Sequence, residues 1–182
     1  MTDEQRIDDL LDRGVENIIS DRESVKKRLM SGDTLNVYLG IDPTATRIHL
    51  GHAFNLRKLQ TMAELGHNVT FLIGDFTALV GDTSDKNDER PVLTPEQITE
   101  NFQSYKEVAS KLLDFDKVTL RRNSEWLSEL NFEELLKLTR EFSVNDFISR
   151  ELIRGRLDEG KRVGLAETMY PLMHHGLSFI RI

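Results

Sequence analysis

The chain contains no cysteine among its 182 residues. It therefore has no disulfide bond, no thiolate zinc site and no cysteine nucleophile, and a reducing compartment such as the cytoplasm is the expected location. No run of about eighteen apolar residues is present, so we expect no membrane span. The polar first residues, Met1–Arg6, predict no signal or transit peptide.

Positive charge is also in short supply, since the formal net charge is −7. This balance opposes non-specific binding of nucleic acid by the chain as a whole, so an RNA partner would need a local basic patch or a further segment. Apolar residues make up 38% and charged residues 30%, a composition typical of a globular protein. The length is sufficient for one domain with a real core.

One stretch organises the sequence, and its pattern is strand, turn and helix. Residues 36–41 form a mostly apolar run that predicts a buried strand, and Asp42-Pro43 ends it. A helical spacing of apolar residues then begins at Ala53. His49 and His52 therefore fall at the start of a helix, where unpaired N–H groups and the helix dipole favour phosphate.

A second strand is predicted at residues 68–73 and a third at 117–121, which gives an α/β fold. Two strands joined by a helix form a βαβ unit, and ligands bind at the carboxyl ends of the strands in such sheets. We expect a Rossmann-like parallel sheet with flanking helices. Further helices are predicted before residue 31 with a restart at Asp21, after Thr94, after Asn131 and after Ser143.

The stretch from Tyr38 to His52 resembles a known signature. His49-Leu50-Gly51-His52 resembles the His-x-Gly-His motif of class I aminoacyl-tRNA synthetases, and the preceding Gly40-Ile41-Asp42-Pro43-Thr44-Ala45 is similar to the tyrosyl-tRNA synthetase version. The resemblance implies a tyrosine–tRNA ligase that activates tyrosine with ATP and transfers it to tRNA(Tyr), with Mg²⁺ arriving on the ATP. It also implies a homodimer. An ordinary strand, turn and helix with two surface histidines is the alternative.

The resemblance also implies roles for individual residues. The catalytic residues would be His49, His52 and Thr44; the ATP-binding residues would be Gly51, His49, His52, Gly40 and Asp42; the tyrosine-binding residues would be Tyr38, Asp82, Tyr170 and Asn123. Two assignments stay open. Asp42 suits either the substrate ammonium or the ribose, and Tyr38 would either reach the substrate or fill the core face of its strand.

Four positions depart from the family pattern. Thr83 and Asp85 stand where proline and glycine are usual, and residues 83–89 read as a solvated loop. Near the end, His174 and Leu177 replace glutamine and aspartate, and a leucine cannot accept a hydrogen bond from a phenol. Residues 150–162 hold five basic and three acidic side chains, and we interpret this mildly basic face as a solvated helix surface, with a face near RNA or ATP as the alternative.

The resemblance covers residues 37–173 and then stops. We expect the first half of a synthetase catalytic domain: a helical segment at 1–34, a Rossmann-type part at 35–176 and an unrelated tail at 177–182. The lysine loop and the anticodon-binding region would be missing. The alternatives are a non-catalytic relic that serves as a binding or dimerisation module, and, less favoured, a small-molecule adenylyltransferase. Half a doubly wound sheet leaves an apolar face exposed, so we expect little tyrosine-dependent ATP–pyrophosphate exchange and poor solubility.

Overall fold

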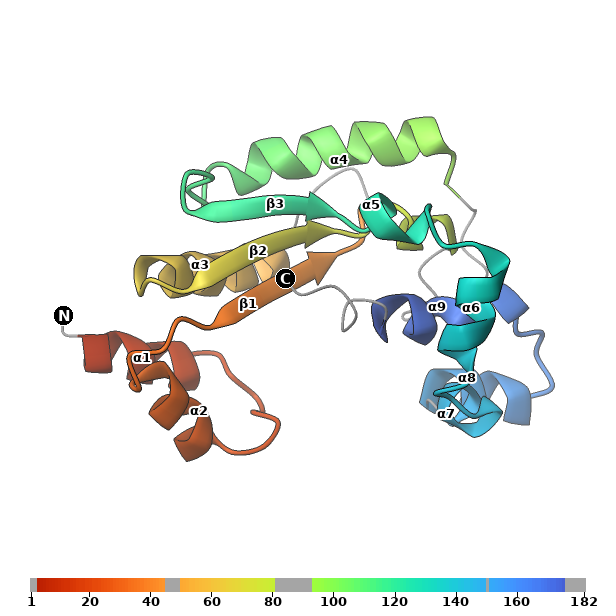
Figure 1. The fold of residues 1–182 in the computed structure, drawn as a ribbon, viewed down its shortest axis with the longest axis horizontal. Coiled ribbons are helices and arrows are strands. Elements are labelled where there is room, and N and C mark those ends of the chain that lie inside the picture. The colour runs from red at the N-terminus through yellow and green to blue at the C-terminus, as the bar shows by residue number, and fades with distance from the viewer. Residues whose placement is uncertain (1–2, 45–49, 81–92, 150, 176–182) are drawn as a thin grey trace. The chain divides into compact units, whose positions relative to one another are not determined.

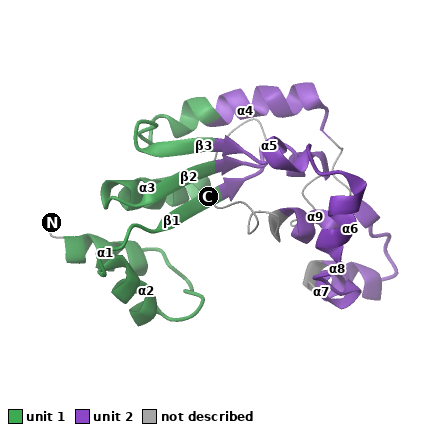
Figure 2. Ribbon diagram, in the orientation of Figure 1, with its two compact units in different colours: residues 1–39, 48–71, 106–120 green, residues 40–47, 72–105, 121–182 purple. Residues whose placement is uncertain are grey.

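The structure is a computed structural model that describes residues 3–44, 50–80, 93–149 and 151–175. Contacts divide the chain into two compact units (Figure 2). Unit 1 comprises Met1–Leu39, Ile48–Phe71 and Lys106–Leu120, and unit 2 comprises Gly40–Arg47, Leu72–Tyr105 and Arg121–Ile182. The predicted division at residues 34 and 176 stays a prediction.

Three strands form one sheet in the order β1 (Asn36–Ile41), β2 (Asn68–Ile73) and β3 (Val118–Arg122) (Figure 1). The amide of Asn68 donates to the Leu35 carbonyl, and the amide of Gly74 donates to the Ile41 carbonyl. From the first bond to the second, donor and acceptor both move toward the C-terminus by six residues, so β1 and β2 are parallel. The predicted α/β fold with a parallel sheet is confirmed. Each strand begins in unit 1 and ends in unit 2.

The strands differ in burial according to their place in the sheet. Residues 69–73 of β2, the central strand, are all buried, which explains its continuous apolar run. In β1 only Ile41 is buried, so the prediction of a buried strand was wrong for residues 36–40. Among the described residues, β1 pairs with β2 alone and lies at the edge of the sheet, and alternate residues along it are exposed.

Unit 1 packs two short helices, α1 (Asp3–Asp12) and α2 (Arg22–Leu29), near α3 (Leu50–Glu64). The predicted restart is confirmed, because the Asp21 carboxylate caps α2 by accepting from the amide of Ser24 at 2.7 Å. The prediction of helix before residue 31 was wrong over residues 15–20, where Ile19 is 93% exposed. The reason is that α1 already ends at Asp12, so the helical spacing does not extend to Ile19. Four side chains form the core of this region: Ile7, Leu10, Leu11 and Leu29.

The remaining elements are η1 (Thr77–Val80), α4 (Pro95–Ala109), α5 (Ser124–Leu127), α6 (Phe132–Thr139), α7 (Val144–Ile148), α8 (Glu151–Asp158) and α9 (Leu165–His175). The helices predicted after Thr94 and Asn131 begin with capping boxes, and Ser143 caps α7 in the same way. α9 contacts both η1 and α7. Within the described ranges, no helix is both long and apolar enough to span a bilayer.

Candidate functional site

The carboxyl ends of the three strands bring together Asp42, Gly74 and Asn123, each the first residue after its strand. Backbone hydrogen bonds continue the ladder to this point. The amide of Gly74 donates to the Ile41 carbonyl at 2.9 Å, and the amide of Asn123 donates to the Ile73 carbonyl at 3.0 Å. This is the edge at which parallel sheets bind ligands, and all of these residues lie in unit 2.

The Asp42 carboxylate lies at the centre of a side-chain hydrogen-bond network. Its Oδ1 accepts from the Thr77 hydroxyl at 2.6 Å, and its Oδ2 accepts from the Tyr170 hydroxyl at 2.5 Å. The turn that places it is held by Pro43, which is fully buried and whose carbonyl accepts from the Asn101 amide at 2.8 Å. The position and orientation of the carboxylate are therefore determined by four elements: β1, η1, α4 and α9.

Asn123 extends this network and is itself buried. Its Nδ2 donates to the Thr77 hydroxyl at 2.8 Å, and its Oδ1 accepts from the amide of Phe76 at 2.8 Å. A hydroxyl has a single proton. The Thr77 hydroxyl lies closer to Asp42 than to the Gly74 carbonyl, which is 3.1 Å away. Thr77 thus accepts from Asn123 and donates to Asp42, so that the amide orients the carboxylate through the hydroxyl.

Gly74 makes room for this arrangement. A Cβ atom at this position would lie 1.8 Å from Oδ1 of Asp42 and 2.4 Å from the Thr77 hydroxyl. No side chain fits there, so the close approach of the Asp42 carboxylate to the end of β2 requires glycine. Beside it, Asp75 accepts from both the amide and the hydroxyl of Ser124, at 3.0 and 2.7 Å, and so fixes the start of α5.

Thr77 and Gly74 were not assigned roles from the sequence. The signal was present, because Gly74-Asp75-Phe76-Thr77 matches the Gly-Asp-Phe-Thr usual in the resembled family. The role itself could not be read from the sequence, since the hydroxyl connects residues that are 35 and 46 positions away.

The structure places the other predicted residues as follows. Tyr38 is 53% exposed, so it does not fill the core face of its strand. The amide of Thr44 donates to the Asp42 carbonyl at 2.8 Å. A Cβ atom at Gly40 would lie 3.8 Å from the Leu72 side chain on the neighbouring strand. His49 and Asp82 lie outside the described residues, as do Thr83, Asp85 and Leu177.

Gly51 and His52 lie in the first turn of α3, in unit 1. Gly51 is exposed and His52 is half-buried. The first turn carries no acidic side chain, so nothing there offsets the positive end of the helix dipole. In the part of the chain that the structure describes, no group of three His, Asp or Glu residues is arranged to hold a metal ion.

Comparisons with known proteins identify the family of this chain. The family model described as tRNA synthetases class I (W and Y) matches residues 30–179. A tyrosine--tRNA ligase of Desulfotalea psychrophila is 44% identical over 168 residues, which is 91% of this chain and 42% of that protein. Tyrosine--tRNA ligase 2 of Vibrio vulnificus is 45% identical over 161 residues, 88% of this chain and 40% of the relative.

Solved structures show the same fold. A C-terminally truncated mitochondrial tyrosyl-tRNA synthetase of Aspergillus nidulans has a TM-score of 0.78 at 24% identity, covering 94% of this chain and 52% of that one. A tyrosyl-tRNA synthetase of Archaeoglobus fulgidus complexed with L-tyrosine has a TM-score of 0.67, covering 96% and 51%. The chain spans 40–42% of the length of these curated relatives and about half of the solved chains. The family match covers most of the sequence, and the chain belongs to the class I tRNA synthetases of the tryptophan and tyrosine group.

Proposed function

We propose that this chain forms part of the catalytic domain of a tyrosine–tRNA ligase. Tyrosine and ATP would be its substrates in the first step, and tRNA(Tyr) would accept the tyrosyl group in the second. The observation that carries the proposal is the Asp42 carboxylate, held by Thr77 and Tyr170 at the ligand-binding edge of the sheet in a member of this family. A cytoplasmic location and a homodimer belong to the same proposal.

The chemistry needs little from the protein beyond positioning. The carboxylate of tyrosine is already a nucleophile, and it attacks the α-phosphate of ATP while pyrophosphate leaves. Catalysis then comes from alignment of the two substrates and from donors that stabilise charge at phosphorus. His49, His52 and Thr44 would supply such donors. The first turn of α3 fits a phosphate, because Gly51 is exposed and no carboxylate competes there.

Mg²⁺ would arrive with the ATP phosphates and neutralise part of their charge. The residues of the Asp42 network would hold the amino acid. The Tyr170 hydroxyl directs its proton at Asp42, which makes its oxygen a better acceptor for the substrate ammonium. Asp82 would share that ammonium, and Asp42 would bind either the ammonium or the ribose. Tyr38, which is exposed, would contact the substrate ring.

Asn123 would act by position rather than by contact with tyrosine. It is buried, and both ends of its amide are engaged with Thr77 and Phe76. Thr77→Val should therefore raise the KM for tyrosine more than it lowers kcat. It releases the Asp42 carboxylate but leaves unchanged the groups that would donate hydrogen bonds to phosphate. Thr77→Ser keeps the hydroxyl and should restore the KM.

The decisive experiment is ATP–pyrophosphate exchange by this chain with and without L-tyrosine. Exchange that depends on tyrosine supports the ligase even when it is slow, because the amino-acid dependence is diagnostic. ATP binding without tyrosine-dependent exchange would favour the alternative, a non-catalytic binding module of the same fold. His49→Ala should slow exchange about a hundredfold with little change in tyrosine binding. A loss confined to tyrosine affinity would refute the role given to His49.

A further inference from the structure

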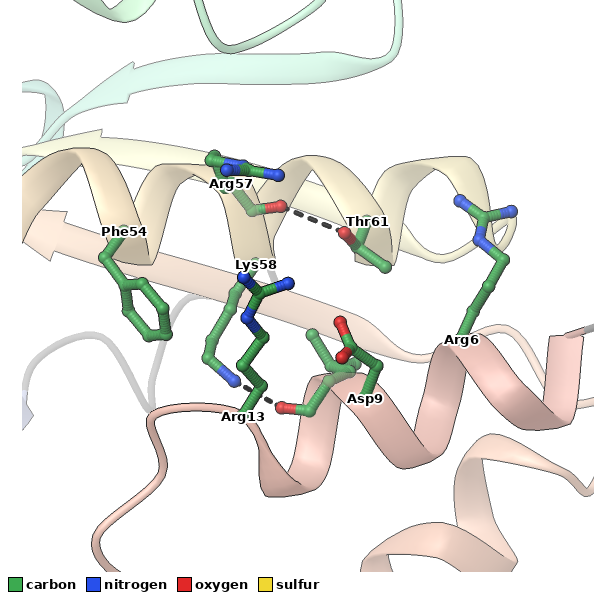
Figure 3. A pocket seen from close by; sticks show the side chains of 8 residues that line it. Arg6, Asp9, Arg13, Phe54, Arg57, Lys58 and Thr61 are labelled. Atoms are coloured by element: carbon green, nitrogen blue, oxygen red, sulfur yellow. Dashed lines mark hydrogen bonds between the residues drawn. The ribbon is translucent and has the colours of Figure 1, made fainter. Parts of the chain in front are cut away.

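A pocket on unit 1 lies between α1 and α3 and is rich in cations (Figure 3). Its volume is about 150 Å³. The side chains of Arg6, Asp9, Leu10 and Arg13 approach from α1 and the residue that follows it, and those of Phe54, Arg57, Lys58 and Thr61 approach from α3. The lining thus holds four cationic groups and a single carboxylate, in a chain whose net charge is −7.

Two of the four cationic side chains form no hydrogen bond or ion pair with a described residue. Arg6 forms an ion pair with Glu64 at 2.5 Å, and the Lys58 ammonium donates to the Leu10 carbonyl near the end of α1. The guanidinium groups of Arg13 and Arg57, in contrast, form no hydrogen bond or ion pair with any residue that the structure describes. The pocket therefore has donors available for a ligand.

An aromatic ring lines the pocket beside Lys58. The Lys58 ammonium lies 5.3 Å from the centroid of the Phe54 ring. That ring packs directly on the backbone of Gly14, where a Cβ would lie 2.5 Å from the ring edge. Burial lowers the pKa of the Lys58 ammonium, while the more distant Asp9 and Asp12 partly oppose this shift. An anion in the pocket would compensate the desolvation of this charge.

We propose that this pocket binds a phosphate group. A guanidinium offers parallel N–H donors that match phosphate oxygens, and a tetrahedral anion accepts from several directions at once, which suits donors carried by two helices. A planar carboxylate has only two oxygens to share. The phosphate is either free or part of a polynucleotide, and its chemistry at the pocket is the same.

This pocket does not use the face of α3 that carries His52. Phe54, Arg57, Lys58 and Thr61 follow the spacing of one helical face. His52 precedes Phe54 by two residues, a rotation of about 200° around the helix axis. The inference is independent of the proposed ligase activity, and its test uses neither ATP nor tyrosine.

Calorimetric titration of the chain with inorganic phosphate tests the proposal. We expect the double substitution Arg13→Gln with Arg57→Gln to weaken binding about tenfold or more, since two charge-assisted contacts are lost. The matched control, Lys27→Gln with Arg28→Gln on α2, removes the same charge outside the pocket and should leave the affinity unchanged. Circular dichroism establishes that both variants are folded.

Three results would overturn the proposal. Phosphate affinity that survives in the Arg13 and Arg57 variant would place the anion elsewhere, for example at the start of α3. An equal loss in the Lys27 and Arg28 control would mean that only net charge matters. A failure of the wild-type protein to bind phosphate at tens of millimolar would show that the pocket is not a phosphate site.

A second pair of substitutions removes negative charge instead of positive charge. Asp9 forms no ion pair with a described residue, so its carboxylate repels an anion without being neutralised. Asp9→Asn should tighten phosphate binding several-fold, whereas Glu16→Gln, an exposed carboxylate outside the pocket, should not. Equal affinities for phosphate in wild type and Asp9→Asn would count against the site.

The source of the phosphate is decided by a single-stranded RNA oligonucleotide titrated at several salt concentrations. If the pocket binds a backbone phosphate, the slope of log K for RNA against the logarithm of salt concentration should be less steep in the Arg13 and Arg57 variant. The expected decrease is about 0.7 per lost phosphate contact. An unchanged RNA affinity and salt dependence, together with weakened inorganic phosphate binding, would assign the pocket to a free phosphate.

Discussion

At the scale of single residues, Gly74 determines whether Asp42 can take its place at the end of β1. Gly74→Ala would bring a methyl group to 1.8 Å from the Asp42 carboxylate and so displace it or the Thr77 hydroxyl. Overpacking of this kind costs roughly 1–3 kcal/mol. We expect a lower midpoint of urea unfolding and weaker binding of L-tyrosine by calorimetry.

Gly155→Ala is the matched control for this substitution. It lies within α8, and a Cβ there meets nothing within 4 Å. Since glycine is a poor helix former, this change should stabilise the protein by up to about 1 kcal/mol. Equal unfolding midpoints for the two alanine variants would mean that the carboxylate is not confined as the structure indicates.

At the scale of elements, α9 is held to α8 by one largely buried ion pair. Arg156 contacts Glu167 at 2.6 Å, with 15% and 10% of their side chains exposed, and the Glu167 carboxylate also accepts from the amide of Gly164. Arg156 donates further to the Arg162 carbonyl. The expectation of a solvated basic surface between 150 and 162 was therefore wrong at Arg156. Because α9 carries Tyr170, this pair fixes the helix that reaches Asp42.

Arg156→Met tests this element. It leaves the Glu167 carboxylate buried without its cation, which typically costs about 3 kcal/mol or more. The pair between Lys137 and Glu133 on α6 provides the control, because its side chains are 62% and 78% exposed. Lys137→Met should change the free energy of unfolding by less than about 0.5 kcal/mol. Similar urea midpoints for both variants would show that the two pairs contribute alike.

At the scale of the whole molecule, stability should depend on pH in two steps. His67 is buried beside β1, and its ring nitrogen accepts from the amide of Leu35 at 3.4 Å. Burial lowers the pKa of His67 below its ordinary 6.5. In the unfolded chain this histidine binds a proton near pH 6.5, whereas the folded protein does not. Stability is therefore full above that pH and falls as the pH drops toward the folded pKa.

The second step comes from carboxylates in the ion-pair network of α1 and α2. Hydrogen bonds from Lys26 and Arg22 lower the pKa of Asp8, and Arg22 lowers that of Asp12, below the ordinary 3.8. Their contribution is present above about pH 4 and is lost as the pH falls through the folded values. Urea unfolding between pH 8 and 3 should show both declines. His67→Asn keeps an acceptor but cannot titrate, so the upper decline should disappear; its persistence would assign it to another group.

Much of the fold follows from local features of the sequence. The strands at 36–41 and 68–73 and the caps at Asp21, Asn131 and Ser143 depend on side chains within a few residues of each other, so their patterns can be recognised without the fold. The edge position of β1 was not predictable in this way, because it depends on which strand pairs with which. The family resemblance was also legible, since it rests on contiguous motifs.

The sequence alone determined the fold class, the family and the candidate set that includes Asp42, Asn123 and Tyr170. Only the tertiary structure decided that Thr77 joins Asp42 to Asn123, that Gly74 leaves space for the carboxylate, and that Tyr170 donates to Asp42 across 128 residues. The cation-rich pocket between α1 and α3 belongs to the same class of result. The physical reason is that hydrogen bonds and charge clusters depend on distances of about 3 Å between residues that chain order separates widely.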